Sequence, residues 1–313
     1  MEEQATFPKT LQEANKHFSD KETCTTFMAQ IRWPEGVTCP NCEGKAVSYL
    51  STRFMWKCKA CKKQFSVKQG TVMEDSPIGL DKWLVAMWLI ANAKNGISSC
   101  EISRALGVTQ KSAWFLLHRI RLAMQNGTFE KFSGVVEVDE TYIGGKARFM
   151  HRDKREAQIQ GRGSVGKVAV MGLLERNGKV RAKVIGNTTR ETLHGEVKSH
   201  VEEGAEIFTD QFAAYKGLET DYIHNLINHA EKYVDGNVHT CNIDNFWSLL
   251  KRGIKGTYVS VEPFHLFRYL DEQTFRFNTR KGNDADRFLQ TVKNVAGKRL
   301  TFDELTGKGA SSH

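Results

Sequence analysis

Three aspartates occupy positions from which they could hold a metal ion against a phosphate group. Asp139 lies in the strand-forming run "SGVVEVDETYIGG", where Glu137 and Asp139 share one side of the strand and Val136 and Val138 the other. Asp210 ends the short apolar strand "AEIFTD", and ligands of α/β sheets collect beyond strand ends. Taken singly, each carboxylate fits a capping or surface position better than a metal site.

The segment "NIDNFWSLLKRG" is predicted to be helical and supplies a third carboxylate, Asp244. Ser248 and Lys251 follow Asp244 at i+4 and i+7, on the same face of that helix. An apolar stripe on another face is expected to pack on a sheet, and it consists of Ile243, Trp247 and Leu250. Asp244 and Lys251 should therefore project together toward a cleft or its rim.

Three carboxylates from two strands and one helix predict two hard divalent cations, Mg²⁺ or Mn²⁺, about 4 Å apart. One cation would lower the pKa of an attacking water or 3′-OH, and the other would stabilise the departing 3′ oxygen during in-line displacement at phosphorus. Lys251 would hold a DNA phosphate. The expected catalytic residues are Asp139, Asp210, Asp244 and Lys251.

Four of the seven cysteines predict a structural zinc site. Cys39 and Cys42 form one C-x-x-C pair, and Cys58 and Cys61 form a second, with residues 43–57 between the pairs. Two such knuckles complete a tetrahedron of thiolates around Zn²⁺, and a closed site with four protein ligands is structural. A disulfide or a redox pair would not explain two pairs at this spacing.

Residues 76–127 are predicted to contain a helix-turn-helix. Ser98 and Glu101 fit a capping box that begins one helix, Gly107 ends it, and Thr109 caps the next. A helical hairpin without DNA contacts is the alternative. Four residues of the second helix are expected near phosphates or base edges, namely Lys111, Ser112, Arg119 and Arg121.

The charge balance favours nucleic acid as the partner. Lys and Arg number 45 against 36 Asp and Glu, which gives a net charge of +9. No segment reaches the roughly 18 apolar residues of a membrane span, and the N-terminal "MEEQATFPKT" lacks the layout of a secretory signal. These features predict a cytoplasmic, nucleoid-associated protein that binds double-stranded DNA and no membrane.

The order of elements in residues 133–281 predicts an α/β fold. A strand near 134–142 is followed by a hairpin through Asn177 and Gly178, a helix, two strands and two helices. That order is typical of an RNase H-like catalytic domain, a mixed sheet with helices. The chain is thus expected to comprise a zinc ribbon module (1–75), the helix-turn-helix region (76–127), the catalytic domain (133–281) and a C-terminal tail (282–313).

Long runs of the sequence resemble the DDE-type transposases of bacterial insertion sequences, in the group related to eukaryotic Merlin elements. They are "RWPEGVTCPNC", "WKCKACKKQFSVKQGTVMEDS", "VEVDETYIGG", "FTDQFAAYKGL", "NIDNFWSLLKRGIKGTY" and "HLFRYLDEQTFRFNTRK". The resemblance implies two-metal cleavage and transfer of DNA strands by an RNase H-like domain. It further implies a dimer or larger assembly on DNA, because two element ends must be brought together.

Carried over by residue, Asp139 and Asp210 match the first two acidic ligands of that family. The third, commonly Glu, is matched by Asp244, whose side chain is one methylene shorter, and the adjacent Asn245 is a fallback ligand. Lys251 matches the basic residue seven positions later. His229 and His239 precede this helix and would contact the scissile phosphate or make a loop hydrogen bond.

Three functions remain open on these grounds. The first is a transposase that binds the terminal inverted repeats of its insertion sequence and catalyses strand cleavage and strand transfer. The second is an RNase H-like nuclease that hydrolyses DNA without joining it. The third is a zinc-dependent DNA-binding regulator without catalysis, which Asp244 in place of Glu would favour.

Overall fold

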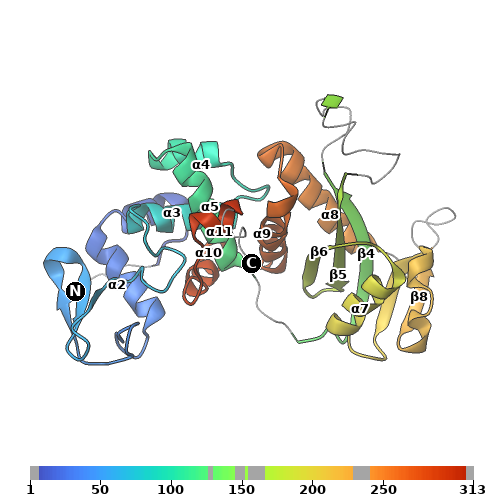
Figure 1. Cartoon of the computed structure of the whole chain (residues 1–313), viewed down its shortest axis with the longest axis horizontal. Helices are drawn as coiled ribbons and strands as arrows, with labels where there is room; N and C mark the ends of the chain where they lie inside the picture. The colour runs from blue at the N-terminus through green and yellow to red at the C-terminus, as the bar shows by residue number, and fades with distance from the viewer. Residues whose placement is uncertain (1–6, 126–129, 145–151, 154–165, 228–239, 308–313) are drawn as a thin grey trace. The chain divides into compact units, whose positions relative to one another are not determined.

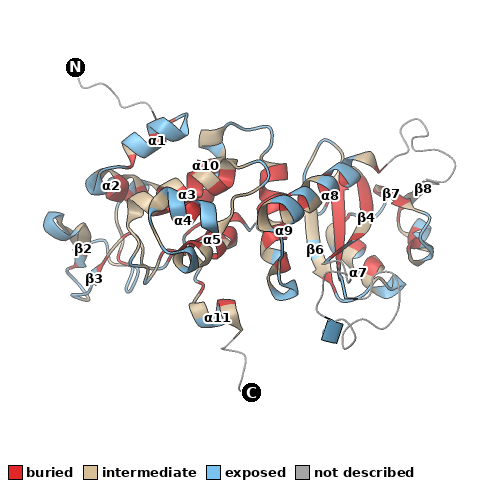
Figure 2. Cartoon of the chain, turned by 90° about the horizontal axis from the view of Figure 1, so that it is seen from above, coloured by how far each residue is buried: buried red, intermediate tan, exposed pale blue. Residues whose placement is uncertain are grey.

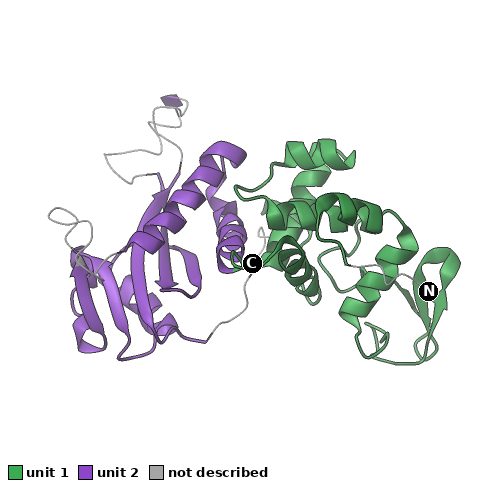
Figure 3. Cartoon of the chain, turned by 180° about the vertical axis from the view of Figure 1, so that it is seen from behind, with its two compact units in different colours: residues 1–125, 279–313 green, residues 126–278 purple. Residues whose placement is uncertain are grey.

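The chain divides into two compact units. A computed structural model describes residues 7–125, 130–144, 152–153, 166–227 and 240–307. The first unit combines residues 1–125 with residues 279–313, and the second spans residues 126–278 (Figure 3). The segments expected as a separate ribbon module and helix-turn-helix region therefore belong to one compact unit.

The first unit contains helices and, at one edge, a small antiparallel sheet (Figure 1). Its sheet has the order β1-β2-β3, with bounds Val47–Leu50, Met55–Cys58 and Gln64–Phe65. Its helices are α1 (Leu11–His17), α2 (Lys21–Arg32), α3 (Leu80–Asn92), α4 (Ser99–Leu106), α5 (Gln110–Met124), α10 (Asp284–Lys293) and α11 (Phe302–Thr306). Among the described residues, no helix is both long enough and apolar enough to cross a membrane.

The expectation of a C-terminal tail is wrong for residues 284–306. Helix α10 packs on α3, and Phe288 is fully buried with its ring 5.1 Å from Trp88 and 5.5 Å from Phe18. The backbone joins as well, because the Val72 amide donates to the Val295 carbonyl at 3.0 Å. The aromatic side chain of a short amphipathic helix thus completes a core that begins near the N-terminus.

The second unit is a five-stranded mixed sheet, as the sequence predicted for an RNase H-like fold. The strand order is β6-β5-β4-β7-β8. Strands β4 (Val135–Ile143), β5 (Val168–Glu175) and β6 (Val180–Ile185) pair antiparallel, while β7 (Glu206–Asp210) lies parallel to β4 and to β8 (Ile223–Ile227). The helices are α7 (Arg190–His200), α8 (Cys241–Gly253) and α9 (Leu266–Asn278). The β5–β6 hairpin turns at Asn177, whose φ is +60°.

Helices cover both faces of this sheet (Figure 1). The period-two pattern of β4 sends Val136 and Val138 into the core beneath α7. The opposite face packs against α8 and α9, where Trp247 belongs to the core. Strand β4 is accordingly buried over most of its length (Figure 2), although it carries three acidic residues. Glu137 is fully buried and Asp139 and Glu140 are half-buried, and acidic residues so placed need an explanation.

Candidate metal and DNA sites

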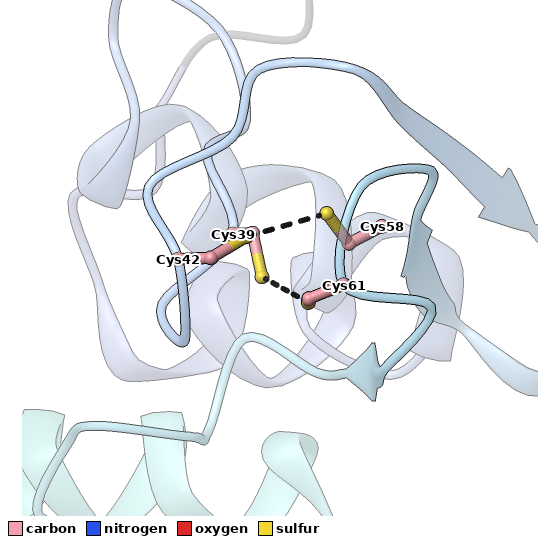
Figure 4. Close-up of side chains that lie close together, drawn as sticks. All are labelled: Cys39, Cys42, Cys58 and Cys61. Atoms are coloured by element: carbon pink, nitrogen blue, oxygen red, sulfur yellow. Dashed lines mark hydrogen bonds between the residues drawn. The ribbon is translucent and has the colours of Figure 1, made fainter.

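The four cysteines predicted to bind zinc converge in the first unit (Figure 4). Their sulfur atoms all lie within 4.8 Å of one another, with Cys39–Cys61 and Cys42–Cys58 Sγ–Sγ distances of 3.6 Å. A tetrahedron with Zn–S bonds of about 2.3 Å requires sulfurs about 3.8 Å apart. The observed spacing therefore fits a Zn²⁺ ion with four thiolate ligands and no open position.

The two C-x-x-C knuckles have the same backbone construction. In the first, the Cys39 amide donates to the Gly44 carbonyl, and Glu43 adopts a left-handed φ of +58°. In the second, the Cys58 amide donates to the Lys63 carbonyl, and Lys62 has a φ of +62°. Each knuckle thus turns back sharply on a left-handed residue just after its second cysteine, which aims both thiols of the pair inward.

Two of the predicted acidic ligands lie at equivalent heights on neighbouring parallel strands. The β4–β7 pairing runs from Val135–Glu206 to Glu137–Phe208, and two residues farther along these strands lie Asp139 and Asp210. The Asp210 carboxylate accepts a hydrogen bond from the Phe212 amide at 3.0 Å, which orients it just beyond the strand end. Both side chains are only half-buried, so they are open to a ligand.

Glu137, which sequence reasoning left as a neighbour of Asp139, has a structural role of its own. Helix α8 has no side-chain cap from its own N-cap residue. Instead the Glu137 carboxylate, fully buried, accepts from the backbone amides of Asn242 and Ile243 at 3.0 Å each. It also accepts from Arg176 Nε at 2.9 Å. A strand residue therefore satisfies the free amides at the start of the helix and places negative charge at its positive end.

Helix α8 presents the third carboxylate beside the sheet. Its apolar stripe is buried as predicted, and Trp247 Nε1 donates to Asp139 Oδ2 at 2.8 Å. With about 100° per residue, Asp244 lies about 60° around the helix from Trp247, and Asn245 about 160°. Asn245 therefore faces away from the sheet that Trp247 contacts, which disfavours it as the fallback ligand. Lys251 is half-buried in the last turn of α8.

Asp210 and Asp244 are near enough to Asp139 for their charges to affect its pKa. Burial, followed by the negative charges of Glu140, Asp244 and Asp210, raises the pKa of Asp139 to about 7, against the opposing hydrogen bond from Trp247. Mutual repulsion among carboxylates is relieved when a cation binds between them. Among the described residues, however, only the four cysteines have potential ligand atoms all within 4.8 Å, so the aspartates form an open rather than a closed group. His229 and His239 lie outside the described residues.

Glu140 and Tyr215 are a second pair that sequence reasoning missed. Tyr215 is fully buried, and its hydroxyl donates to Glu140 Oε2 at 2.6 Å. Burial raises the pKa of Glu140, and the charge of Asp210 adds to this. Burial likewise raises the pKa of Tyr215 well above its usual value. The hydroxyl therefore stays protonated and fixes Glu140 next to the aspartates; the run "FTDQFAAY" held no periodic signal for this contact.

The helix-turn-helix forms with the predicted caps. Ser98 and Glu101 make a complete capping box at the start of α4, Gly107 ends that helix with a φ of +60°, and Thr109 caps α5. Lys111 is exposed, and its ammonium lies 4.9 Å from the centre of the Phe302 ring. Ser112 is half-buried and accepts a hydrogen bond from the Thr109 hydroxyl at 2.9 Å, so it serves the cap.

Two of the residues predicted to contact DNA, Arg119 and Arg121, are buried. Arg119 is 6% exposed, and its guanidinium donates to the carbonyls of Leu300 at 2.9 Å and Glu74 at 2.7 Å. Arg121 is buried as well. A buried arginine that satisfies backbone carbonyls cannot reach a phosphate, so of the four predicted residues only those in the first turn of α5 remain candidates for DNA contact. The exposed basic side chains of the ribbon extend the surface available to DNA: Lys45, Arg53, Lys57, Lys59, Lys62 and Lys63.

Each of the two units contains a match to a known protein family. Residues 131–278 match the family described as the ISXO2-like transposase domain, and residues 19–64 match the transposase zinc-ribbon domain. An uncharacterized protein in transposable element ISH50 of Halobacterium salinarum is 28% identical over 250 residues, which cover 76% of this chain and 84% of that protein. An uncharacterized transposase-like protein of Haemophilus influenzae is 29% identical over 101 residues, 32% of this chain and 81% of its own length.

These matches and the fold agree on one class. The zinc-ribbon match coincides with the four-cysteine cluster, and the transposase-domain match coincides with the mixed sheet. Together the two matches cover more than half of the chain. The chain belongs to the insertion-sequence transposases that join an N-terminal zinc ribbon to a DDE-type, RNase H-like domain.

Proposed function

We propose that this transposase cuts DNA at the ends of its insertion sequence and joins the freed 3′ ends to target DNA. The observation that carries the proposal is the electrostatic grouping of Asp139, Asp210 and Asp244, in which the pKa of Asp139 reaches about 7 through burial and neighbouring negative charge. Asp139 and Asp210 are half-buried on neighbouring parallel strands, Asp244 is exposed on α8, and such a group of repelling carboxylates is suited to cations.

The donor set fits hard divalent cations. Asp139, Asp210 and Asp244 offer carboxylate oxygens alone, the ligands that Mg²⁺ and Mn²⁺ prefer, and together they would hold a pair of such ions. When bound, the ions would supply Lewis-acid activation of the attacking oxygen and charge stabilisation at the leaving 3′ oxygen.

The remaining roles belong to side chains that surround this group. Lys251, on α8, would neutralise a phosphate of the strand being cut. Glu137 and Trp247 hold α8 to β4 and so orient Asp244 and Asp139. The exposed first turn of α5 with Lys111, and the basic surface of the ribbon, would bind the terminal repeats. Two copies of the chain or more would be required to hold two ends at once.

The test is a cleavage and joining assay with labelled element ends, a target plasmid and Mg²⁺ or Mn²⁺. Asp139→Ala, Asp210→Ala and Asp244→Ala should each lower cleavage at least about 10²-fold, because each removes several kcal/mol of metal-mediated stabilisation, while DNA binding persists. Asn245→Ala is the matched control for Asp244→Ala and should cut at the wild-type rate. Cleavage without any joined product would favour a nuclease, and a wild-type chain that never cuts would refute the proposal.

A further inference from the structure

Trp247 makes a contact that core packing alone does not require. Its indole ring is 3% exposed in the core between α8 and the sheet, and its Nε1 donates to Asp139 Oδ2 at 2.8 Å. An indole N–H is a donor only, and a buried donor needs a partner. Here the partner is a carboxylate that the proposed function assigns to metal binding, which leaves Asp139 Oδ1 as the oxygen not engaged by the indole.

Gly172 explains how the indole reaches this position. Gly172 lies directly opposite Asp139 in the β4–β5 pairing. A Cβ atom at Gly172 would lie 2.6 Å from Trp247 Cζ2, 2.8 Å from Trp247 Cη2 and 3.0 Å from Ile243 Cδ1. Carbon atoms that are not bonded to each other need about 3.5 Å. The φ of Gly172 is not positive, so the backbone does not demand glycine here. Glycine is required because the Trp247 ring occupies the space where a Cβ atom would lie.

We propose that Trp247 and Gly172 together form a positioning device for Asp139, in which the hydrogen side chain of Gly172 lets the indole descend onto β5 and hold one carboxylate oxygen while the other is presented to a divalent cation. This rests on the proposed function, because it gives Asp139 a metal to bind. Trp247 and Gly172 are positioning residues, since each would act only through Asp139.

The device makes two predictions from opposite sides of one contact. Trp247→Phe keeps a buried aromatic ring and removes the donor. Gly172→Ala keeps the donor and raises the ring away from Asp139. Loss of a hydrogen bond that orients a metal ligand typically lowers metal affinity 10- to 100-fold, so each variant should weaken Mn²⁺ binding by at least about tenfold. The double variant should bind Mn²⁺ no more weakly than the single variant with the lower affinity, because both changes remove the same hydrogen bond.

The experiment measures Mn²⁺ affinity of the full-length, zinc-loaded chain by electron paramagnetic resonance, with the thermal midpoint recorded for each variant. Phe246→Leu is the control for loosened packing, since the Phe246 ring is buried 5.1 Å from the Trp247 ring and 5.4 Å from the Phe277 ring but has no donor for Asp139. It should lower the midpoint and leave Mn²⁺ affinity unchanged. Additive losses in the double variant, or wild-type Mn²⁺ affinity in Trp247→Phe, would overturn the positioning role.

The outcomes for the two proposals can be told apart. If wild-type Mn²⁺ binding depends on Asp139 and the chain cuts DNA, but both positioning variants bind Mn²⁺ normally, only the positioning inference fails. If Asp139→Asn binds Mn²⁺ as tightly as the wild type, Asp139 is not a ligand and both proposals fail. If Phe246→Leu weakens Mn²⁺ binding as much as Trp247→Phe, general loosening of α8 accounts for the effect and the specific contact is refuted.

Discussion

Replacement of Glu137 by Gln should loosen the whole site without touching any proposed ligand. The Glu137 carboxylate accepts hydrogen bonds from Arg176 Nε, from both the backbone and side-chain nitrogens of Asn242, and from the Ile243 amide, at 2.8–3.0 Å. Glutamine has nearly the same shape but offers one oxygen. The NH₂ group of the glutamine must therefore face hydrogen-bond donors that have lost their acceptor, and the negative charge at the start of α8 is lost.

The size of the effect follows from the surroundings. Loss of one partner of a buried ion pair costs about 3–5 kcal/mol. The Arg176 side chain is 17% exposed and its guanidinium lies 4.4 Å from the centre of the Phe208 ring, so part of its charge remains solvated and we take the lower end, about 3 kcal/mol. In a unit of this size, about 1 kcal/mol shifts the thermal midpoint by 2–4 °C. The midpoint of the catalytic unit should therefore fall by about 6–12 °C.

Calorimetry measures that shift, and hydrogen exchange locates it. The amides of Asn242 and Ile243 should exchange faster in Glu137→Gln, because a neutral carbonyl oxygen at best replaces their charged acceptor. Glu196→Gln is the control, since Glu196 pairs with a Lys183 side chain that is 62% exposed, and exposed pairs contribute about 1 kcal/mol at most. The reasoning would be refuted if both variants melted alike and the two amides kept their wild-type protection.

Further predictions concern charge, zinc and DNA. The pKa of Asp139 is about 7 in the folded chain and near 3.8 in the unfolded chain, so the free energy of unfolding of the wild type without Mg²⁺ falls as pH rises from about 4 through 7. In urea unfolding, Asp139→Asn should be more stable than the wild type by up to about 4 kcal/mol at pH 8 and no more stable at pH 4. Cys58→Ser should lose bound zinc in a colorimetric chelator assay, whereas Cys100→Ser, at an exposed cysteine, should keep it. Lys111→Ala should reduce the salt dependence of DNA binding by about one phosphate contact. Arg119→Met should instead lower the thermal midpoint, since two buried carbonyls lose their donor at about 1–3 kcal/mol each.

The features that the sequence predicted well are those written in short-range patterns. The C-x-x-C spacing, the Ser98–Glu101 capping box and the Asn177–Gly178 hairpin each depend on residues a few positions apart. The order of elements in the catalytic unit followed from the same local signals and sufficed to predict the mixed sheet. Local hydrogen bonds and turn geometry determine these features, so they need no knowledge of the remaining chain.

The features that it missed depend on partners far away in the chain. Arg119 looked like a DNA contact because its acceptors, the carbonyls of Glu74 and Leu300, belong to segments 45 and 181 residues distant. Residues 284–306 looked like a tail because α10 and α11 are short, and only the pocket around Phe288 makes them part of the core. Glu137 looked like a surface carboxylate because its amide donors lie 105 and 106 residues later.

The contacts from Glu137 and Asp139 also set the position of the third carboxylate. Glu137 and Asp139 are two residues apart on β4, about 6.6 Å, and their partners Ile243 and Trp247 are four apart on α8, about 6 Å. Because these spacings match, a slide of the helix by one residue, about 1.5 Å, would break both contacts at once. Asp244 lies between the two anchored positions, so bonds made by other residues fix its backbone beside β4. An aspartate is one methylene shorter than glutamate, so the proposed role of Asp244 as a metal ligand depends on a helix that is held close to the sheet, and Glu137 and Asp139 both bond to that helix.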